Sequence, residues 1–141
     1  MLSVSQTAGY AIMALCCLDP ECQKMVLARD IAEQTGIPKP YLSKMLNQLQ
    51  HAGLIIGKRG YKGGLILTRP AGEITMLDVV VIVDGEDWCR KCFLGLPGCG
   101  SGQPCPMHDF WGDERMRIET MLRDMKLDSL HDFKKEGWRL N

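Results

Sequence analysis

The chain has 141 residues, 45% of them hydrophobic and 24% charged, and its formal net charge is zero. This length suits one compact domain with a small appendage, and the ordinary composition excludes disordered, fibrous and membrane proteins. The longest uninterrupted apolar run, residues 11–18, is much shorter than the roughly 20 residues of a membrane-spanning helix. Because no Lys or Arg precedes Lys24, this run also lacks the positive flank of a signal peptide, and we expect a cytoplasmic protein.

Helical spacing of apolar residues predicts three helices in the first third of the chain. The first covers 5–18, and the second covers 27–35, where Gly36 provides a glycine stop. The third begins at position 38 or 39 and ends at 52, with its apolar residues at i, i+3, i+4 and i+7. Two short strands, 54–58 and 65–68, are then joined by a basic, glycine-rich turn.

The zero net charge hides an asymmetry between the two halves of the chain. Residues 1–70 hold eight Lys or Arg and four Asp or Glu, whereas residues 71–141 hold nine and thirteen. Residues 36–70 contain six cations and no acid at all, which is typical of a surface that binds a polyanion. A solvated positive face with no partner would leave the same pattern.

The third predicted helix turns a cationic, hydrogen-bonding face outward, and that face suits phosphates and base edges. Together with the short turn before it and the basic hairpin after it, this helix predicts a winged helix-turn-helix that reads the major groove. Arg59 suits either a minor groove or a phosphate. The residues that we expect to contact DNA are Lys39, Tyr41, Ser43, Lys44, Asn47, Lys58, Arg59 and Lys62.

Two further helices and a tail are predicted in the second half of the chain. Thr75 can cap a helix that runs through Val83, and helical spacing resumes from Asp109 or Gly112 to Lys126. The apolar stripe of this later helix could pack on the first helix, pair with the same helix of a second subunit, or do both. The predicted fold is mainly α with a small β-hairpin wing, and it has three parts: a winged helix-turn-helix domain with its following helix (1–84), a cysteine-rich loop (85–108, the cysteine segment below), and a long dimerisation helix with the tail (109–141).

The cysteines divide into two groups. Three of the seven lie in or just after the first helix, where two are expected to be core hydrophobes, and the odd total disfavours a secreted disulfide framework. The other four, Cys89, Cys92, Cys99 and Cys105, crowd together, and His108 follows them. Thiolates bind zinc or iron–sulfur clusters, and the gaps of six and five residues favour a cluster over a zinc ribbon.

A third interpretation is a thiol–disulfide enzyme that uses the pair Cys89 and Cys92. Against it, no thioredoxin-like βαβ pattern surrounds the pair. It would also leave the basic face of the third helix without a purpose.

Four blocks of residues resemble one known family over most of the chain. The blocks are Tyr10-Ala11, the stretch 37–54, the motif Arg59-Gly60-x2-Gly63-Gly64, and the set Cys92, Cys99, Cys105 and His108. They are similar to the winged-helix bacterial regulators that include the iron–sulfur assembly regulator IscR and the nitric-oxide-sensing repressor NsrR. The resemblance implies a homodimeric DNA-binding repressor or activator, not an enzyme, whose DNA affinity or site choice depends on a bound cluster.

The resemblance also implies a ligand set. Cys92, Cys99 and Cys105 match the three thiolate ligands of the family, and His108 matches the histidine of the assembly-regulator branch. The implied cofactor is an iron–sulfur cluster, 2Fe–2S favoured over 4Fe–4S, with zinc as the alternative metal. The implied partners are a palindromic double-stranded DNA operator and a second copy of the chain.

Two positions depart from the family pattern. The nitric-oxide branch takes an aspartate from the partner's first helix, but the matching position here is Gly9, and no acid precedes Asp19. Cys89 is an additional cysteine, which could replace His108, act as a resolving thiol, or be a bystander, the role we favour.

Overall fold

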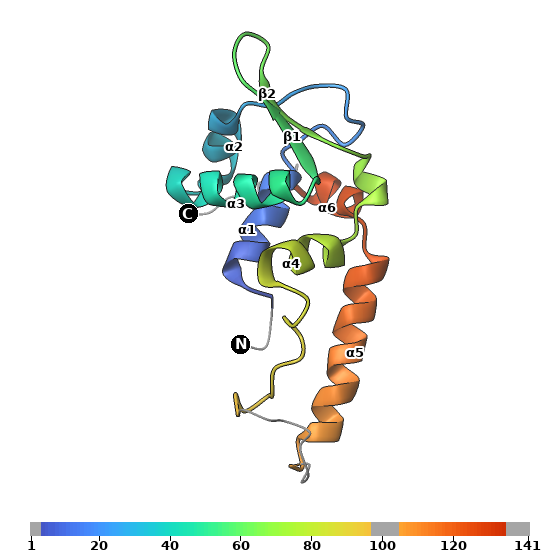
Figure 1. Cartoon of the computed structure of the whole chain (residues 1–141). Coiled ribbons are helices and arrows are strands. Elements are labelled where there is room, and N and C mark those ends of the chain that lie inside the picture. Colours follow the sequence, from blue (N-terminus) through green and yellow to red (C-terminus); the bar gives the residue numbers. More distant parts are fainter. Residues whose placement is uncertain (1–3, 97–104, 135–141) are drawn as a thin grey trace.

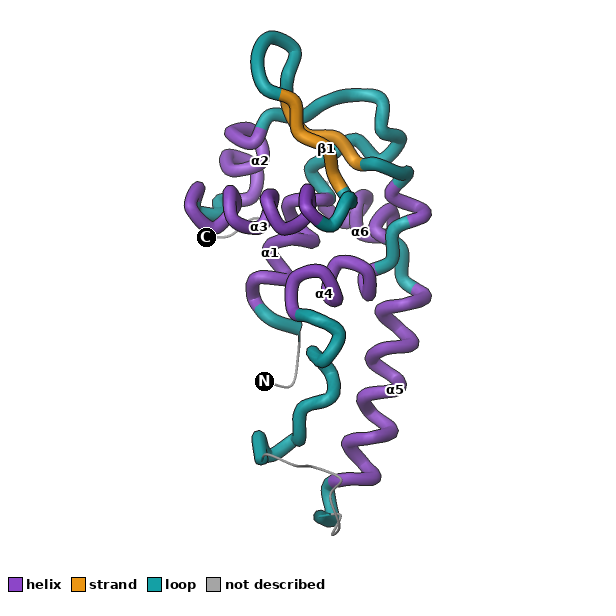
Figure 2. The backbone as a smooth tube through the Cα atoms, viewed as in Figure 1, coloured by secondary structure: helices purple, strands orange, loops and turns teal. Residues whose placement is uncertain are grey.

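The computed structural model describes residues 4–96 and 105–134 of the chain. Most of the helices gather with a hairpin into a head, and one long helix projects away from it (Figures 1 and 2). This arrangement confirms the predicted mainly α fold with a small β-hairpin wing. The elements are α1 (Gln6–Leu15), α2 (Ala28–Thr35), α3 (Lys39–His51), β1 (Ile55–Lys58), β2 (Gly64–Leu67), η1 (Ala71–Glu73), α4 (Met76–Asp84), α5 (His108–Asp124) and α6 (Leu127–Lys134).

Helix α1 forms the centre of the head. It packs against α2, α3 and α4, and its residues 11–15 are all buried, which explains why its sequence is apolar on nearly every side. Cys16 and Cys17 are also buried, as predicted for core hydrophobes. The helix ends at Leu15 rather than Leu18, because the N–H groups of Cys17 and Leu18 bond three residues back, in a tight final turn.

A short turn sets the position of α3 relative to α2. Gly36 adopts a left-handed conformation with φ 74°, and its N–H bonds to Ala32 and ends α2. The Thr35 hydroxyl donates to the carbonyl of Ile31 and accepts from the N–H of Ile37, so the turn is held from both sides. Helix α3 then begins at Lys39, close to the predicted start.

The hairpin of β1 and β2 forms the wing. The two strands pair antiparallel, with Ile55 opposite Leu67 and Lys58 opposite Gly64, within one residue of the predicted bounds. Val26, just before α2, exchanges two backbone hydrogen bonds of 2.8 and 2.9 Å with Leu65 and so ties the wing to the head. Gly64 has φ 141°, and a Cβ there would lie 2.9 Å from the Val26 oxygen, so this contact requires glycine.

The start of α1 is bonded to the end of α4. Thr75 caps α4 in a capping box with Asp78, as its sequence position predicts, and the helix ends at Asp84. The Asp84 carboxylate accepts a hydrogen bond of 2.9 Å from the Ser5 N–H and another from the Ser5 hydroxyl, whose oxygen also accepts the Ala8 N–H. One serine therefore caps α1 and anchors the point at which the cysteine segment begins.

The long helix α5 differs from expectation in its packing partner. It packs mainly against α4 rather than against α1. None of its residues is fully buried, and only Leu122 among its apolar residues packs against the core. Helix α6 then returns to the head, where Leu127 is buried and its N–H bonds to Ile74. No helix in the described ranges has both the length and the apolar content to cross a membrane.

We predict that Ser5→Ala destabilises the head. The variant loses the side-chain cap of α1 and the hydroxyl donor to Asp84, while the backbone N–H donor to that carboxylate remains, and the free energy of unfolding falls by about 1–2 kcal/mol. Urea denaturation followed by circular dichroism measures this change. Ser129→Ala, at an exposed position of α6, is the matched control and should leave stability unchanged. Equal stability of the two variants would contradict the anchoring role of Ser5.

Candidate nucleic-acid interface and cysteine segment

Helix α3 presents one buried and one exposed face. Its buried face is an apolar stripe at i, i+3, i+4 and i+7, formed by Leu42, Met45, Leu46 and Leu49. The five residues of α3 that were expected to contact DNA all lie on the opposite, exposed face, namely Lys39, Tyr41, Ser43, Lys44 and Asn47. The sequence prediction therefore separated the two faces of this helix correctly.

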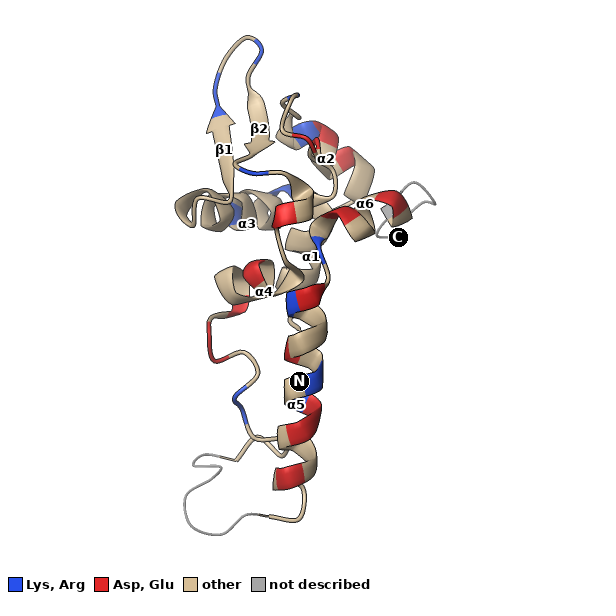
Figure 3. Cartoon of the chain, turned by 90° about the vertical axis from the view of Figure 1, so that its right-hand side faces the viewer, with Lys and Arg blue, Asp and Glu red and all other residues tan. Residues whose placement is uncertain are grey.

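The wing carries the other predicted DNA contacts. Lys58 ends β1, and Arg59 and Lys62 lie in the turn that follows, all three exposed. At the tip, Tyr61 is 91% exposed and the Lys62 ammonium lies 5.8 Å from the centre of its ring. Figure 3 shows cations and no acids on α3 and the wing, whereas both signs alternate along α5. The positive surface therefore belongs to these two elements.

A groove of about 440 Å³ lies between α3 and the wing. Ser43 and Asn47 line it from α3, and Lys58 and Arg59 line it from the hairpin. Glycines in the wing keep the hairpin wall of the groove low, since they add no side chains. Polar residues separated in the sequence by a strand and a turn thus share one concave surface that is suited to a nucleic-acid backbone.

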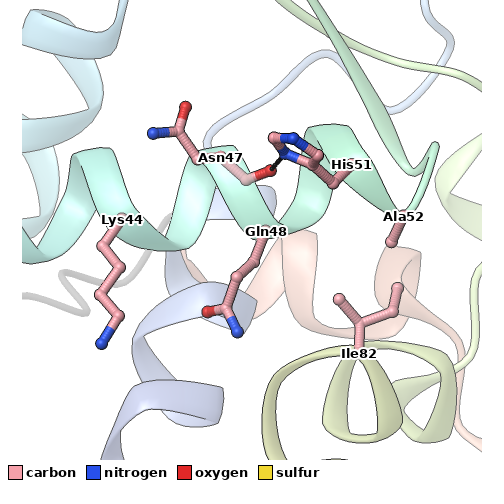
Figure 4. A pocket seen from close by; sticks show the side chains of 6 residues that line it. All are labelled: Lys44, Asn47, Gln48, His51, Ala52 and Ile82. Atoms are coloured by element: carbon pink, nitrogen blue, oxygen red, sulfur yellow. Dashed lines mark hydrogen bonds between the residues drawn. The ribbon is translucent and has the colours of Figure 1, made fainter.

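A second hollow, of about 540 Å³, follows the other side of α3 (Figure 4). Lys44 and Gln48 extend from α3 toward the side where Ile82 of α4 closes the hollow. The Nδ1 of His51 bonds to the Asn47 carbonyl at 2.8 Å, so this ring is held by its own helix. Helix α3 is therefore flanked by the wing on one side and by α4 on the other.

The first part of the cysteine segment, residues 85–96, lies along α5. The Arg115 guanidinium donates to the Cys89 carbonyl at 3.4 Å, and the Cys89 thiol donates to the Arg115 carbonyl at 3.8 Å. The Trp111 indole N–H donates to the Lys91 carbonyl at 2.9 Å, and its ring packs edge-on against Phe93, with 5.6 Å between ring centres. These contacts were not predicted, because they join distant residues whose order shows no periodic pattern.

The predicted metal ligands lie on either side of a gap in the described residues. Cys92 is half-buried, and its carbonyl accepts the Gly95 N–H. Cys105 lies just before α5 and His108 is the first residue of that helix, and the backbone N–H of His108 donates to the Cys105 carbonyl at 2.9 Å. Cys99 lies outside the described residues. Within those residues, no three His, Cys, Asp or Glu side chains come together as a metal site. The donor types suit a thiophilic metal or cluster, and the ligand set stays a prediction.

The additional cysteine, Cys89, lies against α5. Burial raises the pKa of its thiol, and Glu119 acts in the same direction, while the nearby Arg115 guanidinium opposes both. The thiol borders a small cavity of about 200 Å³ that is also lined by Arg90 and Met116. A thiol that is protonated and bonded to a carbonyl suits the bystander role favoured for Cys89.

Comparisons with known proteins agree with this architecture. The model of the Rrf2 family, described as iron-dependent transcriptional regulators, matches residues 4–132. The HTH-type transcriptional regulator IscR of Xenorhabdus nematophila is 34% identical over 130 residues, which cover 92% of this chain and 79% of that protein.

Solved structures give the same fold. The oxidised form of Staphylococcus aureus CymR superposes with a TM-score of 0.73 at 26% identity, covering 92% of this chain and 96% of that one. IscR of T. potens superposes with a TM-score of 0.74 at 24% identity, covering 99% and 93%. The predicted family and winged-helix fold are confirmed, and the relatives are regulators of transcription rather than thiol–disulfide enzymes. The chain belongs to the Rrf2 family of DNA-binding transcriptional regulators.

Proposed function

We propose that this Rrf2-family regulator is a homodimer that binds a palindromic operator with an affinity set by an iron–sulfur cluster on its cysteine segment. The observation that carries the proposal is the acid-free exposed face of α3, which shares a groove with the cationic wing. In this proposal residues 1–84 read DNA, residues 85–108 hold the cluster, and residues 109–141 join the two subunits.

The DNA-binding surface has two kinds of side chain with different tasks. Lys39, Lys44 and the wing cations neutralise phosphates, because an ammonium or guanidinium is attracted to any phosphate whatever the base sequence. Ser43 and Asn47 carry neutral donors and acceptors that suit base edges in the major groove, where Asn pairs with adenine. Affinity and sequence preference therefore depend on different residues of the same helix.

We predict that Lys44→Ala and Asn47→Ala both weaken DNA binding but differ in their effect on its salt dependence. Lys44→Ala should weaken binding to a duplex selected for tight binding by the wild type, and should lower the slope of log affinity against log salt by about one. Asn47→Ala removes no charge, so it should lower affinity for that duplex and leave the slope unchanged. Fluorescence anisotropy across a salt series measures both values. A wild-type slope in the Lys44 variant would remove Lys44 from the phosphate contacts.

The exposed apolar residues of α5 support dimerisation. Met116 is 64% and Met121 53% exposed, and both border a shallow hollow of about 660 Å³ on the outer face of the helix. Asp113, Arg117 and Asp124 surround them, so the face combines an apolar centre with a charged rim. Two copies joined through this helix present their α3 helices to successive major grooves, about 34–36 Å apart on a palindromic site.

We predict that Met121→Lys converts the dimer into a monomer, because a lysine at the centre of the apolar face places a desolvated charge in the interface. Sedimentation velocity measures the mass. Ile56→Lys, at a comparably exposed position on β1, is the control and should remain dimeric. An unchanged mass for Met121→Lys would exclude this face as the subunit contact.

The proposed ligands are Cys92, Cys99, Cys105 and His108, with 2Fe–2S as the favoured cluster type. Bound there, an iron–sulfur cluster supplies a centre that responds to iron supply and oxidation state. The chain supplies three soft thiolates and one imidazole. Trp111 and Phe93 pack edge-on beside this part of the segment, and the Trp111 bond to the Lys91 carbonyl fixes the backbone just before Cys92.

Coupling to DNA follows from the way in which the segment is attached. It begins directly after Asp84, which anchors α1 through Ser5, and it is docked on α5 through Trp111 and Arg115. Ordering the segment therefore biases the placement of the head relative to the dimer helix and hence the spacing of the two α3 helices. A coupling free energy of about 1–3 kcal/mol changes DNA affinity about 5- to 150-fold.

We predict that Cys105→Ala abolishes cluster uptake and leaves a folded dimer. Anaerobically purified wild-type protein should absorb visible light and contain acid-labile sulfide, and the variant should lack both. Cys22→Ala, which removes a half-buried thiol outside the cysteine segment, should keep both signals. Normal iron and sulfide contents in Cys105→Ala would show that Cys105 is not a ligand. A colourless wild-type protein that contains one zinc ion would exclude the cluster and indicate a structural zinc site instead.

A further inference from the structure

A groove of about 550 Å³ separates α3 from the first part of the cysteine segment. Two cations reach it from different elements: Lys44 from α3 and Lys91 from the segment. The other polar or aromatic residues that line this groove are Ser5, Thr7, Gln48, Asp84 and Trp88.

We propose that Lys91 is a further DNA contact, which binds a backbone phosphate together with Lys44 at the edge of α3 opposite the wing. The proposal rests on DNA binding through α3, and it extends the DNA-binding surface into the cysteine segment. Nothing in the sequence pattern of the winged helix-turn-helix points to this residue, since it lies after the wing and after α4.

The dimensions of the duplex explain why a phosphate reaches this groove. A helix is about 10–12 Å across with its side chains, and the major groove is about 12 Å wide, so the two DNA strands flank a recognition helix closely. On one flank of α3, Lys58 and Arg59 of the wing face the adjacent strand. On the other flank, the first cations available are Lys44 and Lys91. Both strands then meet a pair of cations.

The charges around the groove leave both lysines available. Neither Lys44 nor Lys91 forms an ion pair with any residue in the described ranges. The carboxylate in the groove, Asp84, accepts hydrogen bonds at both oxygens from Ser5. Nearby Asp87 is paired with Arg90 at 3.5 Å. Gln48, which is half-buried beside Lys44, adds an amide donor of the kind that often accompanies lysine at phosphates.

The neighbouring cation Arg90 provides a matched comparison. Arg90 lines the small cavity beside Cys89 and Arg115 on the α5 side, whereas Lys91 lines the groove beside α3. The two side chains carry the same charge, are adjacent in the chain and face different elements. A contact specific to Lys91 can therefore be distinguished from a general effect of removing one positive charge.

The test compares Lys91→Gln with Arg90→Gln on the duplex selected by the wild-type protein. Lys91→Gln should reduce affinity about eightfold at 0.1 M salt and lower the salt slope by about one, which is the contribution of one neutralised phosphate. Arg90→Gln should change neither value, and Lys91→Arg should restore both. Because the Lys91 carbonyl, and not its side chain, accepts the Trp111 bond, Lys91→Gln should also melt at the wild-type temperature.

Two outcomes would overturn the proposal. An unchanged slope for Lys91→Gln, with a reduced slope for Lys44→Ala, would exclude the contact while leaving DNA binding by α3 intact. Equal losses in Lys91→Gln and Arg90→Gln would replace a specific contact by a general charge effect. If the wild type showed no salt-dependent binding to any duplex, the proposed function itself would fail, and this result is distinguishable from the other two.

Discussion

Burial of the apolar stripe of α3 fixes which of its residues meet DNA. Each of Leu42, Met45, Leu46 and Leu49 contributes about 1.5–3 kcal/mol by leaving water, so rotation of the helix about its axis would expose several of them together. The opposite face is therefore held toward solvent with no need for a polar contact of its own. The turn at Gly36 and the wing bridge at Val26 then set the direction of this face relative to the rest of the head.

The cysteine segment is in contact with two parts of the protein that have different proposed tasks. Its backbone is bonded to Trp111 and Arg115 of α5, while the side chains of Trp88 and Lys91 border the groove next to α3. A change in the conformation of the segment would therefore alter contacts both with α5 and at the edge of the DNA-binding surface. The effects of cluster binding on subunit placement and on phosphate contact need not be separate events, because Lys91 directly precedes the proposed ligand Cys92.

The sequence predicted the helices, the wing and the exposed face of α3 because each has a local, periodic signal. Errors were small where a cap was visible, as at Thr75, and larger at the end of α1, where apolar residues continue into a tight turn that spacing does not distinguish from a helix. The predicted packing partners of α5 were wrong in part, because an apolar stripe can pack on any apolar surface and does not specify which one. The Ser5–Asp84 bond and the Trp111–Lys91 bond join residues far apart in sequence, and no local sequence pattern predicts such pairs. The metal-ligand assignment came from family resemblance, and it remains untested by the described geometry.

The bond between Ser5 and Asp84 has a practical consequence for work on the purified protein. Its donors include the backbone N–H of Ser5, so the main chain at Ser5 is held beside Asp84 whatever side chain stands there. An amino-terminal alteration that displaces Ser5 would therefore disturb both the origin of the cysteine segment and the groove that Ser5 lines with Lys44, and it would confuse any comparison of metal content with operator affinity.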